Sequence, residues 1–500
     1  MHNSQKTQGG PEAADYYDLI LKNGQVYDGN GNPPQKADVA IKADRIIAIG
    51  DVDPTQGNAV IDATGLAVAP GFIDTHTHDD LAVIMAPDLP AKVSQGVTTV
   101  IVGNCGYSYT PLKLEWAKDP HIKDFGLEDD SGKRKPIEFA TFSDYTDEIE
   151  RVRPAVNTAV FIGHGTLRLG AMDRIDREAE AAEISLMKER LDGCMKAGAM
   201  GLSTGLIYDV NMAANTDEIV ELAKVLNTYN GIYATHMRSE GEHVTAAISE
   251  TFEIGRRADV SVFISHHKSA RKFPKSQETL ALIDAARKHQ CVGLDAYPYA
   301  ATSTLLLPRF VDDDTPIMVS ECESYPEMSG RYLDDIATQW GCSRQAAAER
   351  LEPAHAVYFS LDEDGVRRIL SYPHTMIGSD GLQDDTHPHP RLWGTFPRVL
   401  GHYSRDIGLF PMEEAIRKMT SLPADTFGFS HRGRIETGYF ADLVVFNPDT
   451  IIDRATFEDP IQPADGIERV IVNGAVTWCD GKPTGSRAGQ VLKRGRDIYG

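Results

Sequence analysis

The sequence predicts an α/β protein: a (β/α)8 TIM-like barrel with a small β domain built from both chain termini and an insertion over the barrel mouth. Three observations predict this class. Short apolar strands alternate with helices from about residue 70 to 430. Both ends of the chain carry strand-and-turn patterns instead. The length of 500 residues fits such a barrel with an added small domain.

The small β domain is predicted to combine an N-terminal part, residues 15–69, with a C-terminal part, residues 431–490. Its strand-like runs, each bounded by polar turn residues, are 17–26, 37–42, 45–49, 441–446 and 468–476. Short β-prone runs with such turns between them are typical of hairpins. Because both ends show the same pattern, one domain made from both is the economical arrangement.

Residues 70–430 are predicted to form the barrel. The strand-like runs here are 98–102, 158–162, 231–235, 260–265, 292–295 and 375–378, and helical stretches such as 177–197 and 217–226 separate them. This alternation favours a parallel sheet, and the length favours a closed barrel over an open sheet. The acidic segment 309–353 is interpreted as an insertion over the barrel mouth. It is either a lid or a pair of surface helices with no role in catalysis.

The composition excludes several classes of protein. A hydrophobic fraction of 41% with 25% charged residues is ordinary for a globular chain. The net charge of −23 disfavours nucleic acid and anionic membranes as partners. The polar N-terminus has no apolar signal segment, and no apolar run is long enough to span a membrane. Six cysteines without paired spacing indicate reduced thiols, so we expect a cytoplasmic protein.

Metal-ligand side chains follow the predicted strands. His76 and His78 lie near the end of the first barrel strand, where alternation places both on one face together with Asp74. Four further candidates follow four other strands: Cys105, His236, His266 and Asp380. We expect all these side chains to meet, because parallel barrel strands carry their chemistry at the C-terminal ends. Imidazole, thiolate and carboxylate groups together suit zinc.

Two of these positions allow other interpretations. Cys105 is an inert buried thiol, a nucleophile served by a nearby histidine, or a metal-bound thiolate. The other ligand-type groups around it favour the thiolate ligand. His267 points away from His266 if the strand continues, so it is interpreted as a packing or supporting residue.

Longer motifs carry a family resemblance. The run Pro70-Gly-Phe-Ile-Asp-Thr-His-Thr-His78 resembles the entry motif of the amidohydrolase superfamily, and residues 432–446 resemble its return to the β domain. Within the superfamily, eight segments resemble the N-acyl-D-amino-acid deacylases: 96–106, 163–168, 201–208, 235–238, 265–268, 297–299, 378–381 and 389–396. These motifs occur in the family's order and cover most of residues 17–490.

The resemblance implies a zinc enzyme that hydrolyses the amide bond of N-acyl-D-amino acids, giving a carboxylate and a free D-amino acid. It implies one tight zinc on Cys105, His236 and His266, and a second, weaker position that uses His76 and His78 and shares Cys105. Dihydroorotase-like and hydantoinase-like members bridge two metals with a carboxylated lysine. No lysine occupies a comparable strand-end motif here, and in the deacylase pattern the cysteine takes the bridging role.

Asp380 is the candidate general base, which takes a proton from water and passes it to the leaving amine. A turn aspartate is the structural alternative. The resemblance points to Lys268, Tyr299 and Arg391 as groups that bind the substrate α-carboxylate. Their structural alternatives are surface salt bridges for the two cations and core packing for the tyrosine.

Two further side chains have weaker assignments. Tyr208 either lines the acyl or zinc side of the site or is a buried structural tyrosine. Arg309, at the start of the insertion, either meets an acidic side chain of the substrate or is simply exposed.

Two competing functions stay open. One is a D-dipeptidase or another metal-dependent amide hydrolase of the same superfamily, although the missing lysine disfavours the cyclic amidases. The other is a non-catalytic amidohydrolase-like binding protein, which the complete ligand set and Asp380 disfavour. We expect a small-molecule substrate and a monomer or small homo-oligomer. The sequence does not reveal the preferred D side chain or the acyl group.

Overall fold

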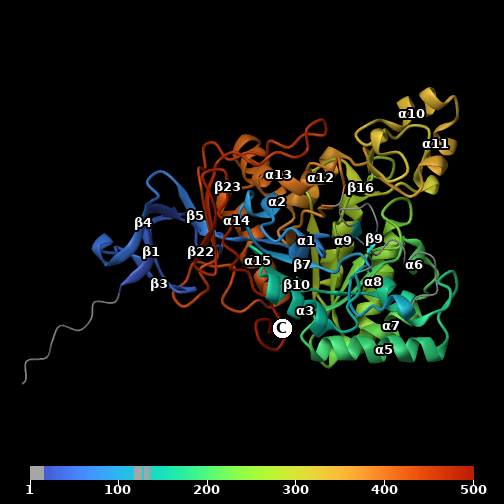
Figure 1. Cartoon of the computed structure of the whole chain (residues 1–500), viewed down its shortest axis with the longest axis horizontal. Helices are drawn as coiled ribbons and strands as arrows, with labels where there is room; N and C mark the ends of the chain where they lie inside the picture. The colour runs from blue at the N-terminus through green and yellow to red at the C-terminus, as the bar shows by residue number, and fades with distance from the viewer. Residues whose placement is uncertain (1–15, 117–126, 129–133, 136, 384, 500) are drawn as a thin grey trace, which may run out of the picture.

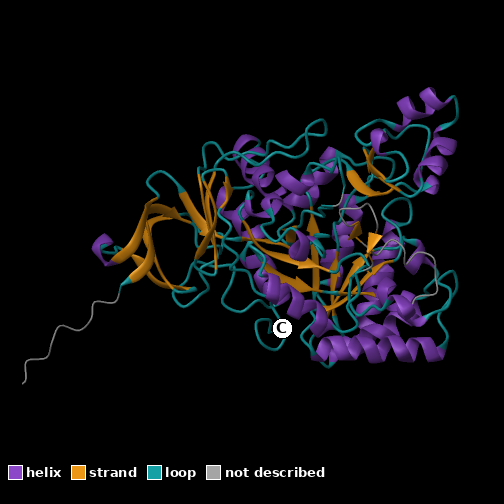
Figure 2. Cartoon of the chain, in the orientation of Figure 1, coloured by secondary structure: helices purple, strands orange, loops and turns teal. Residues whose placement is uncertain are grey.

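The computed structural model describes residues 16–116, 127–128, 134–135, 137–383 and 385–499. Its strands lie in separate regions. Strands from both ends of the chain lie together on one side, and strands from the middle of the chain lie on the other (Figure 1). Helices surround the strands from the middle of the chain (Figure 2). No helix in these ranges is long and apolar enough to cross a membrane.

Both chain ends contribute to one sheet, which has nine strands in the described part of the chain. The N-terminal strands are β1 (Tyr17–Val26), β2 (Gln35–Lys42), β3 (Arg45–Gly50), β4 (Gly57–Asp62) and β5 (Ala67–Pro70). The C-terminal strands are β20 (Leu443–Phe446), β21 (Ile467–Val472), β22 (Ala475–Cys479) and β23 (Lys482–Pro483). β5 and β20 pair antiparallel, and the buried Val39, Val68 and Leu443 share one apolar cluster. The two chain ends therefore form a single sheet.

The middle of the chain forms two parallel sheets. The first has the order β10-β7-β6 and the second the order β11-β12-β13-β14-β15-β19. The strands are β6 (Phe72–Asp74), β7 (Val97–Val102), β10 (Asn157–Val160), β11 (Ile162–Gly163), β12 (Gly201–Gly205), β13 (Ile232–His236), β14 (Ser261–Ile264), β15 (Val292–Ala296) and β19 (Thr375–Ile377). Nearly all their residues are buried, as expected for parallel strands covered on both faces.

Helices separate most of these strands. They are α1 (Ala82–Met85), α2 (Pro90–Val93), α3 (Phe142–Val152), α4 (His164–Ala171), α5 (Ala181–Lys196), α6 (Asp209–Met212), α7 (Thr216–Asn227), α8 (Val244–Ala258), α9 (Ser276–Ala286) and α12 (Glu363–Ser371). After β19 come α13 (Arg391–Arg398), a π-helix (Val399–Asp406), α14 (Met412–Met419) and α15 (Ser421–Phe427). The predicted helical stretches 177–197 and 217–226 correspond to α5 and α7.

Backbone hydrogen bonds connect the two parallel sheets at both margins. At one margin, the Phe161 N–H between β10 and β11 donates to the Val102 carbonyl at 2.9 Å. At the other margin, beyond β6 and β19, the His78 N–H donates to the Gly381 carbonyl at 3.0 Å. The segments that follow the first and last parallel strands therefore lie side by side.

The insertion is larger than the predicted segment 309–353. It contains an antiparallel sheet of β16 (Thr302–Leu305), β17 (Ile317–Cys322) and β18 (Ala354–Tyr358), together with α10 (Leu333–Trp340) and α11 (Arg344–Leu351). Its own apolar cluster includes the buried Val319, Ile336 and Leu351. The flanking strands escaped prediction because each is short and alternates weakly.

The first parallel strand is shorter than the sequence predicted. β6 ends at Asp74, so His76 and His78 follow the strand and do not lie in it. Strand alternation is therefore the wrong reason for their shared orientation. The backbone pairing of this segment with residues 380–381 orients them instead, because the Asp380 N–H donates to the His76 carbonyl at 2.7 Å.

Candidate metal centre and active site

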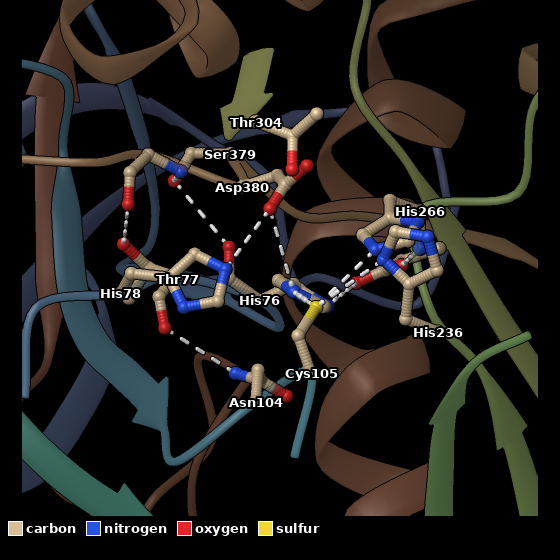
Figure 3. Close-up of polar contacts among 12 residues, drawn as sticks. His76, Thr77, His78, Asn104, Cys105, His236, His266, Thr304, Ser379 and Asp380 are labelled. Carbon is tan, nitrogen blue, oxygen red and sulfur yellow. Dashed lines mark hydrogen bonds and ion pairs between the residues drawn. The ribbon is translucent and has the colours of Figure 1, made fainter. Parts of the chain in front are cut away.

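Three ligand-type side chains converge at the C-terminal ends of β7, β13 and β14 (Figure 3). Cys105 follows β7, His236 ends β13, and His266 follows β14; all three are buried. The Cys105 Sγ lies 3.8 Å from His236 Nδ1 and 3.4 Å from His266 Nε2. Each histidine turns one ring nitrogen toward the same sulfur, so the three atoms can share one metal ion.

A second group adjoins the first and shares its sulfur. The His76 Nε2 lies 3.3 Å from the Cys105 Sγ. The Asp380 Oδ1 lies 3.5 Å from His76 Nε2 and 3.3 Å from His78 Nε2. The ligand atoms of these four residues all lie within 4.8 Å of one another. The sulfur is thus the common member of two potential metal positions.

Burial and nearby charges set the protonation states of these side chains. Burial lowers the pKa of His266 to about 4 and holds the pKa of His76 well below its usual range. Both rings are therefore neutral and keep a lone pair for a ligand bond. Burial, helped by the Asp380 carboxylate, raises the pKa of the Cys105 thiol well above its usual value. A metal cation would reverse that shift, because thiolate is the ligand form, and a thiolate–imidazole set fits zinc.

Three of the clustered residues have a left-handed backbone. The φ angles are 54° at Cys105, 37° at His266 and 50° at Asp380. Residues with a Cβ rarely adopt this conformation because the side chain crowds the backbone. The next residue, Gly106, has φ 81°, and a Cβ there would lie 2.8 Å from the Gly205 nitrogen. Unfavourable backbone held in place by packing is concentrated at functional sites.

Asp380 is ionised and fixed by a buried cation. Its Oδ2 lies 2.8 Å from Arg391 NH1, which leaves Oδ1 facing the histidines. Burial acts to raise the pKa of Asp380, but Arg391 and His266 outweigh it and hold that pKa well below the usual range. Arg391 also donates to the Ser303 carbonyl in β16 at 3.0 Å. The arginine is therefore buried between the insertion and the carboxylate and does not form a surface salt bridge.

A buried lysine, Lys92, binds three polar side chains next to the candidate metal ligands. The Lys92 Nζ donates to Asp74 Oδ2 at 2.9 Å, to Thr77 Oγ1 at 2.9 Å and to Ser379 Oγ at 2.8 Å. The Ser379 N–H donates to Asp74 Oδ1 at 2.8 Å. Asp74, expected on the face of the histidines, therefore faces Lys92 and the chain just before Asp380. Lys92 lies in α2, away from the strand ends, and no sequence motif pointed to it.

Lys268 reaches the ligand cluster. Its Nζ lies 2.9 Å from His266 Nδ1 and forms an ion pair with Glu240 at 2.7 Å. It is buried, which removes the surface salt bridge as an explanation. His267 turns away, with its Nε2 2.9 Å from Thr279 Oγ1, and this contact agrees with a packing role.

The insertion touches the site through Tyr208. The Tyr208 hydroxyl lies 3.3 Å from His236 Nδ1 and 2.9 Å from Thr304 Oγ1 of β16. Arg309, further along the insertion, pairs with Asp209 at 3.0 Å, and both side chains are exposed. β16 therefore contacts the site through Thr304 on Tyr208 and through the Ser303 carbonyl on Arg391, whereas Arg309 forms a surface ion pair.

The structure separates the two tyrosines of the Tyr-Pro-Tyr motif. The Tyr299 ring packs against His389 at 5.2 Å between centroids, away from the metal-ligand groups. Tyr297 lies closer to the site, because its ring centroid is 4.7 Å from the Arg391 guanidinium and 5.7 Å from the Lys268 Nζ. The family resemblance pointed to Tyr299, whereas the geometry places Tyr297 nearer to the two cations.

The parallel strands, with buried side chains of metal-ligand type at their C-terminal ends, define an α/β protein with a candidate metal site. The amidohydrolase family model matches residues 59–304 and 331–478. The chain belongs to the amidohydrolase family, and the predicted resemblance to its N-acyl-D-amino-acid deacylases is confirmed by relatives that match nearly its whole length.

Three similar proteins come from Alcaligenes xylosoxydans xylosoxydans. A D-aminoacylase is 49% identical over 96% of this chain and 98% of its own length. An N-acyl-D-glutamate deacylase is 43% identical over 97% of this chain and 98% of its own length. An N-acyl-D-aspartate deacylase is 44% identical over 96% of both chains.

Two solved structures are similar over 96% of this chain and the whole of the other. One concerns the binuclear metal centre of a D-aminoacylase and has a TM-score of 0.90 with 49% identity. The other is an N-acyl-D-glutamate deacylase from Bordetella bronchiseptica, complexed with zinc and a phosphonate inhibitor that mimics the tetrahedral intermediate. Its TM-score is 0.89 with 42% identity.

Proposed function

We propose that this protein is a zinc-dependent N-acyl-D-amino-acid deacylase, which hydrolyses the amide bond to give a carboxylate and a free D-amino acid. The observation that carries the proposal is the sulfur of Cys105 between two sets of histidines, with the ionised Asp380 beside it. The relatives that match nearly the whole chain are D-aminoacylase and two N-acyl-D-amino-acid deacylases, which supports the substrate class.

Cys105, His236 and His266 would hold the tight zinc, and His76 and His78 would share the same sulfur at a weaker second position. The binuclear centre of the similar D-aminoacylase supports two positions, and the zinc complex of the similar deacylase supports the choice of metal. When bound, zinc polarises the acyl oxygen and lowers the pKa of water to about 7.

The residues of the chain supply proton transfer and substrate orientation. The Asp380 carboxylate accepts a proton from the attacking water and returns it to the leaving amine. Arg391 holds that carboxylate by one oxygen, so the other is free for the proton. Lys268 and Arg391 add the positive charge that a substrate α-carboxylate requires. The resemblance assigns Tyr299 to the same carboxylate, and Tyr297, which lies beside both cations, is a second candidate for that role.

The two parallel sheets would form one closed (β/α)8 barrel of residues 70–430, flanked by a β domain of residues 15–69 and 431–490. The hydrogen bonds at both margins support closure. So does one apolar cluster that draws residues from both sheets, among them Ile73, Ile101, Ala159, Ile232, Phe263 and Met376. The contact of Thr304 with Tyr208 supports an insertion over the barrel mouth, as a lid.

A cytoplasmic location and a monomer or small homo-oligomer complete the proposal. The six cysteines are free thiols, which suits a reducing compartment. The net charge of −23 suits a small-molecule substrate without nucleic acid or membrane partners.

The test is an assay of purified protein, with its zinc content measured, against matched N-acetyl-D and N-acetyl-L amino acids. We expect zinc-dependent hydrolysis of the D forms only. Hydrolysis of the L forms alone, or of neither, would overturn the proposal. D-dipeptides form a third arm, because faster hydrolysis of these would favour a D-dipeptidase.

A further inference from the structure

One carboxylate, that of Glu240, faces the outer ring nitrogens of both histidines in the Cys105 site. Glu240 lies just beyond the end of β13. Its Oε2 is 3.3 Å from His236 Nε2, and its Oε1 is 3.0 Å from His266 Nδ1. These are the ring nitrogens that do not face the sulfur, since His236 turns Nδ1 and His266 turns Nε2 toward Sγ. Glu240 and Cys105 therefore occupy opposite sides of the same two rings.

The arrangement requires different tautomers of the two histidines. A neutral imidazole that binds a metal through one nitrogen carries its proton on the other, and an acceptor there fixes the ring orientation. His236 must then be protonated on Nε2 and His266 on Nδ1. In that state Lys268 Nζ, which lies 2.9 Å from His266 Nδ1, is a second donor to Glu240 Oε1 and does not donate to the ring. Each oxygen of Glu240 faces one outer ring nitrogen, so a single carboxylate can serve as the acceptor for both rings.

Glu240 supports the ligands and is not a ligand itself. In the described part of the chain, the two groups whose ligand atoms lie within 4.8 Å of one another contain Cys105 but not Glu240. Its oxygens face the outer ring nitrogens, as in carboxylate–histidine–zinc triads.

The same carboxylate holds Lys268. The Lys268 Nζ lies 2.7 Å from one oxygen of Glu240 and 2.8 Å from the other. The side chains are only 6% and 16% exposed, respectively. The carboxylate thus binds a buried ammonium group with both oxygens, beside the histidines.

We infer that Glu240 is a positioning residue that couples two functions of the site. It aims His236 and His266 at the metal position beside Cys105, and it holds Lys268 next to them for the substrate carboxylate. The second half rests on the proposed function, whereas the first half concerns metal binding alone.

The first experiment measures zinc affinity without substrate, by competition with a chromophoric chelator. Glu250→Gln is the matched control for Glu240→Gln, because both side chains are 16% exposed and Glu250 pairs with Arg238 at 2.9 Å. We expect Glu240→Gln to weaken zinc binding by about 10- to 100-fold, as for other supporting partners of metal ligands. Glu250→Gln should bind zinc as the wild type does. Wild-type affinity in Glu240→Gln would overturn the inference.

A second pair of variants separates positioning from charge imbalance. Lys268→Met leaves Glu240 in place, so zinc affinity should be kept while KM rises. Glu240→Gln/Lys268→Met removes both charges, which protects folding, and should bind zinc as weakly as Glu240→Gln. If the double variant regains wild-type affinity, an uncompensated lysine explains the loss and the inference is wrong. The visible spectrum of Co²⁺-loaded protein should change in both Glu240 variants and stay unchanged in Glu250→Gln.

The two proposals fail separately. If the wild type hydrolyses N-acetyl-D amino acids but Glu240→Gln binds zinc normally, the inference is wrong and the proposed function stands. If Glu240→Gln loses zinc affinity but no N-acetyl-D amino acid is hydrolysed, the positioning role stands and the proposed function is wrong.

Discussion

Two buried clusters of ionisable groups, one around Glu218 and one around Cys105, differ in how their members are satisfied. The Glu218 Oε1 accepts from His164 Nε2 at 2.9 Å and from Arg168 NH1 at 2.6 Å. Arg168 uses its other terminal nitrogen on the Ile175 carbonyl at 2.8 Å. In this cluster, donors bind acceptors of the protein itself, and these contacts link α4 to α7.

The cluster around Cys105 is arranged differently. Nitrogens of His76, His236 and His266 all face one sulfur, at 3.3 to 3.8 Å. One thiol proton cannot satisfy three ring nitrogens, so the surplus lone pairs need a cation. We therefore interpret the Glu218 cluster, whose groups bind one another, as stabilising the fold. We interpret the Cys105 cluster, whose ring nitrogens all face one sulfur, as a binding site for a metal ion. Four predictions test this distinction.

The largest expected effect is metal removal. Chelation should abolish hydrolysis, and added zinc should restore it, because the proposed reaction requires the metal ion that the converging side chains would hold. The Glu218 cluster needs no metal, so the far-UV circular dichroism spectrum should keep its native shape. Full activity after zinc content falls to zero would contradict the assignment of Cys105 and its histidines.

Asp380→Asn should lower kcat/KM by about 10²- to 10⁴-fold, the usual contribution of general acid–base catalysis, while zinc content is kept. The matched control is Asp385→Asn. Asp385 is as buried as Asp380, but its carboxylate pairs with His355 at 2.6 Å. Activity close to wild type in Asp380→Asn would remove this residue from the mechanism.

Glu218→Gln should act on stability instead of catalysis. Breaking a buried ion pair leaves Arg168 without its anion, at a cost of about 3–5 kcal/mol in the free energy of unfolding. Urea unfolding measures this loss, and zinc content per folded molecule should not change. Glu221→Gln is the control on the same helix, because Glu221 is 41% exposed and should contribute little. A large loss of zinc in Glu218→Gln would contradict the purely structural role assigned to the Glu218 cluster.

The smallest expected effect is the pH dependence of the Glu218 contribution. Burial acts to raise the pKa of Glu218, but His164 and Arg168 outweigh it and lower the pKa from 4.5 to about 2. A depressed pKa stabilises the folded state above pH 4.5, and this stabilisation disappears as the pH falls toward 2. The difference in unfolding free energy between wild type and Glu218→Gln should therefore shrink below pH 4.5. A constant difference would exclude this linkage.

Most of the candidate site was predictable because its residues follow parallel strands. Cys105, His236 and His266 occupy strand ends that the apolar runs already marked, and parallel strands bring such ends together. Glu240 escaped prediction because an acidic residue in a polar loop has no periodic signal. The position of Tyr297 beside Lys268 and Arg391 was not predicted, because the contacts of the two tyrosines in the Tyr-Pro-Tyr motif depend on distant segments.

Contacts between segments far apart in the chain decided the outcome of other predictions. Asp74 was expected beside the histidines, but its carboxylate binds the buried Lys92. Arg309 was predicted either to meet the substrate or to be exposed, and its surface ion pair with Asp209 agrees with the second alternative. The insertion was expected at 309–353, and strands at both of its margins widen it. In each case the deciding partner lies on another element, out of reach of a local pattern.

By itself, the sequence determined the alternation of strands and helices, the residue types of the ligands and their places after the strands. These features follow from local periodicity and from the chemistry of imidazole, thiolate and carboxylate groups. Only the tertiary structure decided which ring nitrogen faces the Cys105 sulfur, which carboxylate backs the histidines, and that Arg391 holds Asp380. Those choices depend on distances between segments far apart in the chain, and packing alone sets such distances.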